Sequence, residues 1–265
     1  MLITSLQNPK IKQIVKLKTK KNRDKMLKMI IEGYYPIKFA LQNKYPFKEL
    51  FICPRLFRSK FNNIILVESV RQLGVPITKV SKEVFKKISN FNTLDGLLAI
   101  APQKKNYLKD HKLDKRGLYI LIESIEKFGN LGAIFRLADN SGASGVIVCD
   151  MRADICNCET FRSSLGTFFS INIFLSTTKE AIAWCKNNQI KIMATSPNTG
   201  INYTKVNMSM PIGIVMGTEY FGLSKGWLDN ADIKIKIPMH GQANSLSVTA
   251  STAIILYEAL RQRKS

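Results

Sequence analysis

Three short loops in this 265-residue sequence hold residue types that can build a ligand site. They span residues 126–132, 217–223 and 237–247, and each follows an apolar run that is typical of a buried strand. All three contain glycine, which tolerates positive φ and lets backbone amides approach a bound molecule closely. The helical pattern after the first loop carries Arg136, and the third loop leads into the last helical pattern of the chain. We therefore expect the chemistry of this protein to take place at these loops.

The loops match none of the common nucleotide motifs. No G-x-G-x-x-G follows a strand pattern and no G-x-x-x-x-G-K-[ST] occurs, which disfavours dinucleotide and Walker-type phosphate sites.

A metal site is also disfavoured, because Cys156 and Cys158 have no second pair at ligand spacing and the chain has only 2 histidines. The cysteines are odd in number and scattered, which predicts reduced thiols at Cys53, Cys149, Cys156, Cys158 and Cys185.

The elements around the loops predict an α/β domain. Strand-like runs alternate with helical patterns, an order that favours a mostly parallel sheet with helices on both faces. The strand-like runs are residues 118–122, 145–149, 190–194, 212–216 and 233–237, and the helical patterns are residues 131–141, 159–166, 178–187 and 246–261. Ligands of such sheets bind in loops beyond the carboxyl ends of the strands.

Positive charge is concentrated in the first part of the chain. The whole sequence has 40 Lys+Arg and 19 Asp+Glu, a net charge of +21. Residues 1–110 hold 23 basic and 7 acidic residues (+16), whereas the remainder holds 17 and 12 (+5). The densest run, residues 10–28, has apolar residues at helical spacing, which predicts an amphipathic helix with lysines on its outer face.

So one-sided a charge favours a polyanionic partner. Nucleic acid is favoured over a membrane surface, because no strongly apolar helix with lipid-inserting Trp or Phe accompanies the charge. We expect lysines to act as point charges on phosphates and Arg23 to fork across one. The residues assigned to this role are Lys10, Lys12, Lys20, Lys21 and Arg23.

The sequence predicts two domains with a boundary near residue 110. Residues 29–101 alternate short β-like runs (29–33, 49–54, 63–67, 77–80 and 96–101) with helical patterns, which indicates a compact α/β domain. Residues 103–115 are charged and poorly periodic, as in a linker. We therefore assign residues 1–110 to a basic recognition domain and residues 111–265 to a catalytic domain. The absence of a long apolar stretch or signal sequence predicts a soluble, cytoplasmic protein.

The three loops resemble the signature motifs of the SpoU (TrmH-type) family of RNA ribose 2'-O-methyltransferases, in the SPOUT superfamily. The matches are GNLGAIFRLAD from residue 129, IVMGTE from residue 214 with a Gly-Leu pair at 222–223, and IKIPM from residue 235 followed by NSLSV from residue 244. Residues 5–12, 32–33 and 95–99 are similar to the ribosomal-protein-like RNA-binding domain that precedes the catalytic domain in many members. Residues 127–149 and 161–166 look closest to ribosomal-RNA methyltransferases of the thiostrepton-resistance type.

The resemblance implies a fold, a cofactor and a partner. The fold is a SPOUT α/β knot, a deep trefoil, preceded by a small RNA-binding domain. The cofactor is S-adenosylmethionine, the substrate is RNA with ribosomal RNA favoured over transfer RNA, and two catalytic domains form a homodimer that shares active-site groups.

The same resemblance assigns the site residues. Catalytic roles fall on Asn130, Arg136, Glu219, Ser245 and Ser247. Cofactor contacts fall on Gly217, Thr218, Glu219, Ile237, Met239, Ser245 and Leu246. Arg162 joins the RNA-binding residues. By residue type alone, Ser245 is also expected to cap the last helix.

Two positions depart from the family pattern. Ser247 and Thr218 stand where the family commonly has Asn. A non-catalytic RNA-binding protein that retains the knot is therefore an alternative, as are a transfer-RNA 2'-O-methyltransferase and, more weakly, a base methyltransferase.

Overall fold

The computed structural model describes residues 2–103, 105–108, 111, 114, 116–151, 154–197, 200–218, 221–242 and 244–264. The chain divides into two compact units. The first consists of Met1–Lys104 with Asp154–Ser170, and the second consists of Lys105–Ala153 with Ile171–Ser265. Within the described residues, no helix combines the length and apolar character that crossing a bilayer requires.

The first unit is built on a mixed sheet with strand order β1-β4-β3-β5-β2. β5 is antiparallel to both β2 and β3, whereas β3 and β1 run parallel to β4. The strands are β1 (Leu2–Ile3), β2 (Lys28–Glu32), β3 (Glu49–Ile52), β4 (Ile77–Val80) and β5 (Leu97–Pro102). The helices are α1 (Pro9–Lys16), α2 (Lys20–Met26), α3 (Tyr34–Gln42), α4 (Lys60–Gln72), α5 (Lys82–Ile88) and α7 (Cys158–Ser163), with short 3-10 turns at Pro54–Leu56 and Thr167–Phe169.

Two predictions for this unit were wrong. The basic run is not one helix, because the chain turns at Leu17 between α1 and α2. The turn frees the carbonyls of Leu17 and Lys18, and the guanidinium of Arg23 donates to both at 2.9 and 2.8 Å. Residues 63–67 were expected to be β-like but belong to α4, where their apolar side chains continue one helix from the Ser59 cap.

The segment Asp154–Ser170 belongs to a different unit from the one that the predicted domain boundary gives it. A boundary near residue 110 places this segment in the second domain, but its contacts group it with the first unit. Its helix α7 contacts β2 and α3, and the buried thiol of Cys158 lies 3.2 Å from the carbonyl oxygen of Ile30. Gly166 fits against α3 so closely that an added Cβ would lie 2.9 Å from Phe39. Contacts with β2 and α3, and not position in the sequence, therefore decide the unit to which this segment belongs.

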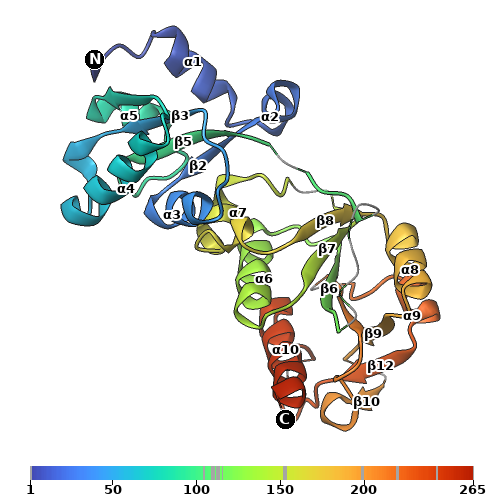
Figure 1. Cartoon of the computed structure of the whole chain (residues 1–265). Helices are drawn as coiled ribbons and strands as arrows, with labels where there is room; N and C mark the ends of the chain where they lie inside the picture. The colour runs from blue at the N-terminus through green and yellow to red at the C-terminus, as the bar shows by residue number, and fades with distance from the viewer. Residues whose placement is uncertain are drawn as a thin grey trace. The chain divides into compact units, whose positions relative to one another are not determined.

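The second unit contains a sheet whose described strands all run parallel. Their order is β10-β12-β9-β11-β6-β7-β8. The strands are β6 (Leu118–Glu123), β7 (Gly145–Cys149), β8 (Ile173–Ser176), β9 (Lys191–Thr195), β10 (Ile201–Asn202), β11 (Ile212–Met216) and β12 (Ile233–Lys236). The helices are α6 (Phe128–Asn140), α8 (Thr178–Asn187), α9 (Lys225–Asn230) and α10 (Val248–Lys264), and a 3-10 turn spans Tyr203–Lys205. Figure 1 shows α6 and α10 on one face of this sheet and α8 and α9 on the other.

This architecture confirms the predicted parallel α/β fold. β6 and β11 are apolar because they lie side by side in the middle of the sheet and are buried throughout. The sequence missed β8, β10 and α9, which are short and weakly periodic. Of the predicted linker, residues 104, 109, 110, 112, 113 and 115 lie outside the described residues. The trefoil knot stays a prediction.

Candidate active site

The second and third loops line a single cavity of about 500 Å³ in the second unit. The carboxyl ends of β9, β11 and β12 and the first turns of α10 form its walls. Six of the residues assigned to the cofactor line it: Gly217, Thr218, Ile237, Met239, Ser245 and Leu246. The seventh, Glu219, lies outside the described residues. A cavity therefore lies at the carboxyl ends of parallel strands, where the sequence predicted a site.

The second loop closes on itself beside the cavity. The amide of Thr218 donates to the carbonyl of Gly222 at 3.0 Å, and the amide of Gly222 returns a bond to Thr218 at 3.1 Å. The backbone is so tight that a Cβ on Gly217 would lie 2.3 Å from the carbonyl carbon of Gly222. Only glycine fits at position 217, and its bare backbone forms part of the cavity wall.

The two departures from the family pattern each hold a local turn. The hydroxyl of Thr218 accepts a hydrogen bond from the amide of Phe221 at 3.1 Å. The hydroxyl of Ser247 accepts one from the amide of Ala250 at 3.2 Å, so Ser247 caps α10. The prediction that Ser245 caps this helix was wrong. Ser245 instead lines the cavity.

The two residues of the first motif that were predicted to be catalytic are not among the described residues of this cavity wall. Asn130 and Arg136 both belong to α6, since the helix begins at Phe128 and takes in part of the predicted loop. Neither is among the described residues that line the cavity. They are six residues apart, which is not the three- or four-residue spacing that brings helical side chains together. Arg136 is exposed.

Glu123 supports the second loop and was not predicted. It ends β6, is only 7% exposed, and accepts hydrogen bonds from the amide of Ser224 at 2.8 Å and the hydroxyl of Thr178 at 3.1 Å. A carboxylate at the end of an otherwise apolar strand was the available signal. Lys236 and Ser251 also line the cavity without having been singled out, since a lysine at a strand end and a serine in a helix are common surface residues.

Most of the predicted phosphate contacts are on the surface. Five of these side chains are exposed, namely those of Lys10, Lys12, Lys20, Lys21 and Arg162. The ammonium of Lys10 already pairs with Glu49 at 2.7 Å, and the guanidinium of Arg162 lies 4.3 Å from the centre of the Phe91 ring.

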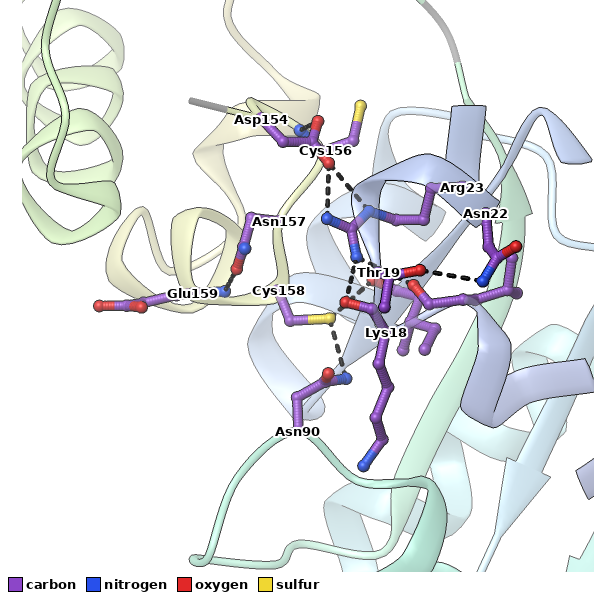
Figure 2. Close-up of polar contacts among 12 residues, drawn as sticks. Lys18, Thr19, Asn22, Arg23, Asn90, Asp154, Cys156, Asn157, Cys158 and Glu159 are labelled. Carbon is purple, nitrogen blue, oxygen red and sulfur yellow. Dashed lines mark hydrogen bonds and ion pairs between the residues drawn. The ribbon is translucent and has the colours of Figure 1, made fainter. Parts of the chain in front are cut away.

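The prediction that Arg23 forks across a phosphate is corrected by the structure. Arg23 is only 5% exposed, and its Nε and Nη2 donate to one carboxylate oxygen of Asp154 at 2.9 and 2.6 Å. Figure 2 shows the guanidinium enclosed between Asp154 and the turn at Lys18. This arginine holds the fold together and does not face solvent.

The cysteines at positions 53, 149, 156, 158 and 185 are free and buried. Burial raises the pKa of the Cys185 thiol to about 12 and raises the pKa of Cys149 well above its usual range. Among the described residues, no group of three or more His, Cys, Asp or Glu side chains could hold a metal ion.

A parallel sheet with a cavity formed by glycine-containing loops at its carboxyl edge is typical of α/β enzymes that bind a small organic molecule. Comparison with known proteins makes this specific. The profile of the SpoU rRNA Methylase family matches residues 117–257, and that of the MRM3-like substrate binding domain matches residues 8–99. The chain belongs to the SpoU rRNA methylase family.

Individual relatives agree over nearly the whole chain. The 23S rRNA (guanosine(2553)-2'-O)-methyltransferase RlmP of Bacillus subtilis (strain 168) is 27% identical over 96% of this chain and 97% of its own length. The crystal structure of an RNA 2'-O ribose methyltransferase superposes with a TM-score of 0.89 at 33% identity, with both chains fully covered. The AdoMet-bound rRNA methyltransferase from Sinorhizobium meliloti gives a TM-score of 0.88 at 28% identity over 98% of this chain and 97% of that one. These matches confirm the predicted family, methyltransferase activity and S-adenosylmethionine cofactor.

Proposed function

We propose that this chain transfers the methyl group of S-adenosylmethionine to a ribose 2'-hydroxyl of ribosomal RNA. The family and the relatives make the chain an S-adenosylmethionine-dependent RNA 2'-O-methyltransferase. Ribosomal RNA is the finer part of the proposal, which the printed activity of RlmP and the substrate-binding profile of the first unit support. The observation that carries the proposal is the single cavity lined by all six described cofactor residues.

The cavity fits this cofactor. Its volume lies in the range of about 300–1,000 Å³ that is usual for small-molecule sites. Leu223, Ile235 and Leu246 give apolar walls for the adenine ring, and the bare backbone at Gly217 allows a close approach. Lys236 and Ser245 supply polar groups for the hydrophilic parts of the molecule. The bound cofactor supplies a sulfonium methyl group that a 2'-oxygen can attack, with sulfur as the leaving group.

The protein must align the 2'-oxygen with the methyl carbon and stabilise the charge that develops on it. A guanidinium stays protonated in proteins, so Arg136 does not act as the general base. Its fork of donors suits the developing oxyanion or the adjacent phosphate. The proton of the hydroxyl must therefore pass to an acceptor other than Arg136.

We further propose that Arg136 acts in the active site of a second subunit in a homodimer. Arg136 lies on α6, outside the described cavity wall of its own chain, and is exposed to a partner. A homodimer in the cytoplasm is the assembly that this proposal requires. Its trefoil knot would hold the second and third loops together.

Two inactive variants test both proposals. We expect Arg136→Ala and Gly217→Ala each to abolish transfer of a tritiated methyl group to unmodified ribosomal RNA. Mixed after reversible dissociation, they should regain activity, because one site of the mixed dimer combines intact loops from one chain with Arg136 from the other. Failure to regain activity would place Arg136 in its own subunit's site, and label on transfer RNA alone would overturn the ribosomal target.

A further inference from the structure

The first unit carries a second cavity, of about 440 Å³, beside helix α4. Its apolar surface comes from the end of β3, the turn that follows it and one side of α4. Ile52 and Val67 are buried beneath it, at 3% and 6% exposure. Phe57 is half-buried, and Ile64 is 60% exposed. We refer to this cavity as the α4 groove.

The rim of the α4 groove is positively charged. Arg55, Lys60 and Arg71 line it, and Glu68 is the only acidic residue among its described lining residues. Glu68 forms an ion pair with Arg71 one helical turn away. The charges of Arg55 and Lys60 therefore give the rim a net positive potential next to an apolar floor.

This combination fits one kind of occupant. The apolar floor suits the face of a base, and the cationic rim suits the phosphates on either side of it. A base inside a duplex cannot enter, because its faces are covered by its neighbours, so the strand must be single. An acidic peptide would satisfy the rim, but its charged side chains would not cover exposed Ile64 and half-buried Phe57.

We propose that the α4 groove binds an unstacked base of single-stranded RNA, with Arg55 and Lys60 on its flanking phosphates. The inference rests on the proposed function, in which RNA is the substrate. It adds a recognition site that is separate from the methyl-donor cavity, since every residue lining the groove belongs to the first unit.

The test compares two neighbouring isoleucines in the full-length protein. Ile64 lines the groove, whereas Ile65 does not, and both are exposed, at 60% and 49%. We expect Ile64→Ser to weaken binding of a fluorescent 12-nucleotide oligouridine about fivefold or more, because the base loses an apolar side chain to cover in the groove. Ile65→Ser should leave affinity unchanged. With an oligonucleotide of abasic spacers the two variants should bind equally, because only the phosphates remain.

Photo-crosslinking gives a second readout. A 4-thiouridine oligonucleotide should crosslink to the peptide containing Phe57, and Phe57→Ala should remove that crosslink. Equal affinity of the Ile64 and Ile65 variants for oligouridine would overturn the groove even where the wild-type protein binds and methylates ribosomal RNA. Absence of any RNA binding by the wild type would overturn the proposed function as well. A change in sedimentation of Ile64→Ser alone, with RNA affinity intact, would assign the groove to a protein contact.

Discussion

Removing the carboxylate of Asp154 should destabilise the first unit more than any surface ion pair could. Two donor atoms of Arg23 meet one oxygen of Asp154, and the two side chains are only 6% and 5% exposed. Asp154→Ala would leave a guanidinium buried with only the carbonyls of Leu17 and Lys18 as acceptors. Breaking such a buried pair costs about 3–5 kcal/mol. The melting temperature of the unit should fall by about 10 °C or more.

The chain offers a way to see which unit responds. Both tryptophans, Trp184 and Trp227, belong to the second unit, so tryptophan fluorescence follows that unit while far-UV circular dichroism follows both. We expect Asp154→Ala to add an early transition in circular dichroism and to leave the fluorescence transition and methyl-donor binding in place. Glu68→Ala is the matched control, because its ion pair with Arg71 is about half exposed and is worth at most about 1 kcal/mol.

A double variant separates the pair from the packing around it. Arg23→Met with Asp154→Leu should be more stable than Asp154→Ala, since it buries no unpaired charge. Equal melting curves for Asp154→Ala and Glu68→Ala would refute the reasoning. So would a double variant that is less stable than Asp154→Ala.

Three further outcomes follow from the structure. Replacing Lys20 and Lys21 by Gln should reduce the slope of log affinity against log salt for single-stranded RNA by about 1.4, at about 0.7 per phosphate contact. Lys10→Gln should change the slope less than either of these lysines does, because Lys10 is paired with Glu49. A double variant with the slope of the wild-type protein would show that Lys20 and Lys21 do not contact phosphates. Ser247→Ala should lower the free energy of unfolding by about 1 kcal/mol, because the α10 cap is lost. Ser245→Ala should lower the affinity for the methyl donor, measured by calorimetry, and leave the free energy of unfolding unchanged. The reverse pattern would exchange the roles of the two serines. Cys185 should resist iodoacetamide at pH 8 in the folded protein, because a pKa of about 12 leaves a thiolate fraction on the order of 10⁻⁴. The same thiol should react in urea. Rapid labelling of Cys185 in the native protein would contradict its burial.

The parallel sheet and the residues that line the cavity of the second unit could be predicted from the sequence, because both depend on local signals. Apolar runs such as β6 and β11 are visible without knowing their neighbours, and glycines such as Gly217 stand directly after a strand. The role of Arg23 could not be predicted in this way. Its partner is Asp154, 131 positions away, and a lysine-rich setting gives an arginine the appearance of a surface residue.

The same difference explains the helix caps and the groove. Ser245 and Ser247 are equally good caps by residue type, and only the start of α10 at Val248 decides between them. The α4 groove arises because residues 63–67 are helical, which the short apolar run did not show. Glu219 stays a predicted site residue outside the described part of the chain.

The return of Asp154–Ser170 to the first unit determines how the molecule can be divided. The chain passes between the units three times, after residues 104, 153 and 170, so no single cut releases either unit whole. A fragment that begins near Gly117 would carry Cys158, Phe161 and Phe168 without the β2 and α3 surfaces that they contact, and these side chains would be exposed to water. A separable catalytic unit therefore requires excision of residues 154–170 and a short replacement linker between β7 and β8, in addition to removal of the N-terminal part. For the same reason, a nascent chain cannot complete the first unit until the first two strands of the catalytic sheet have been synthesised.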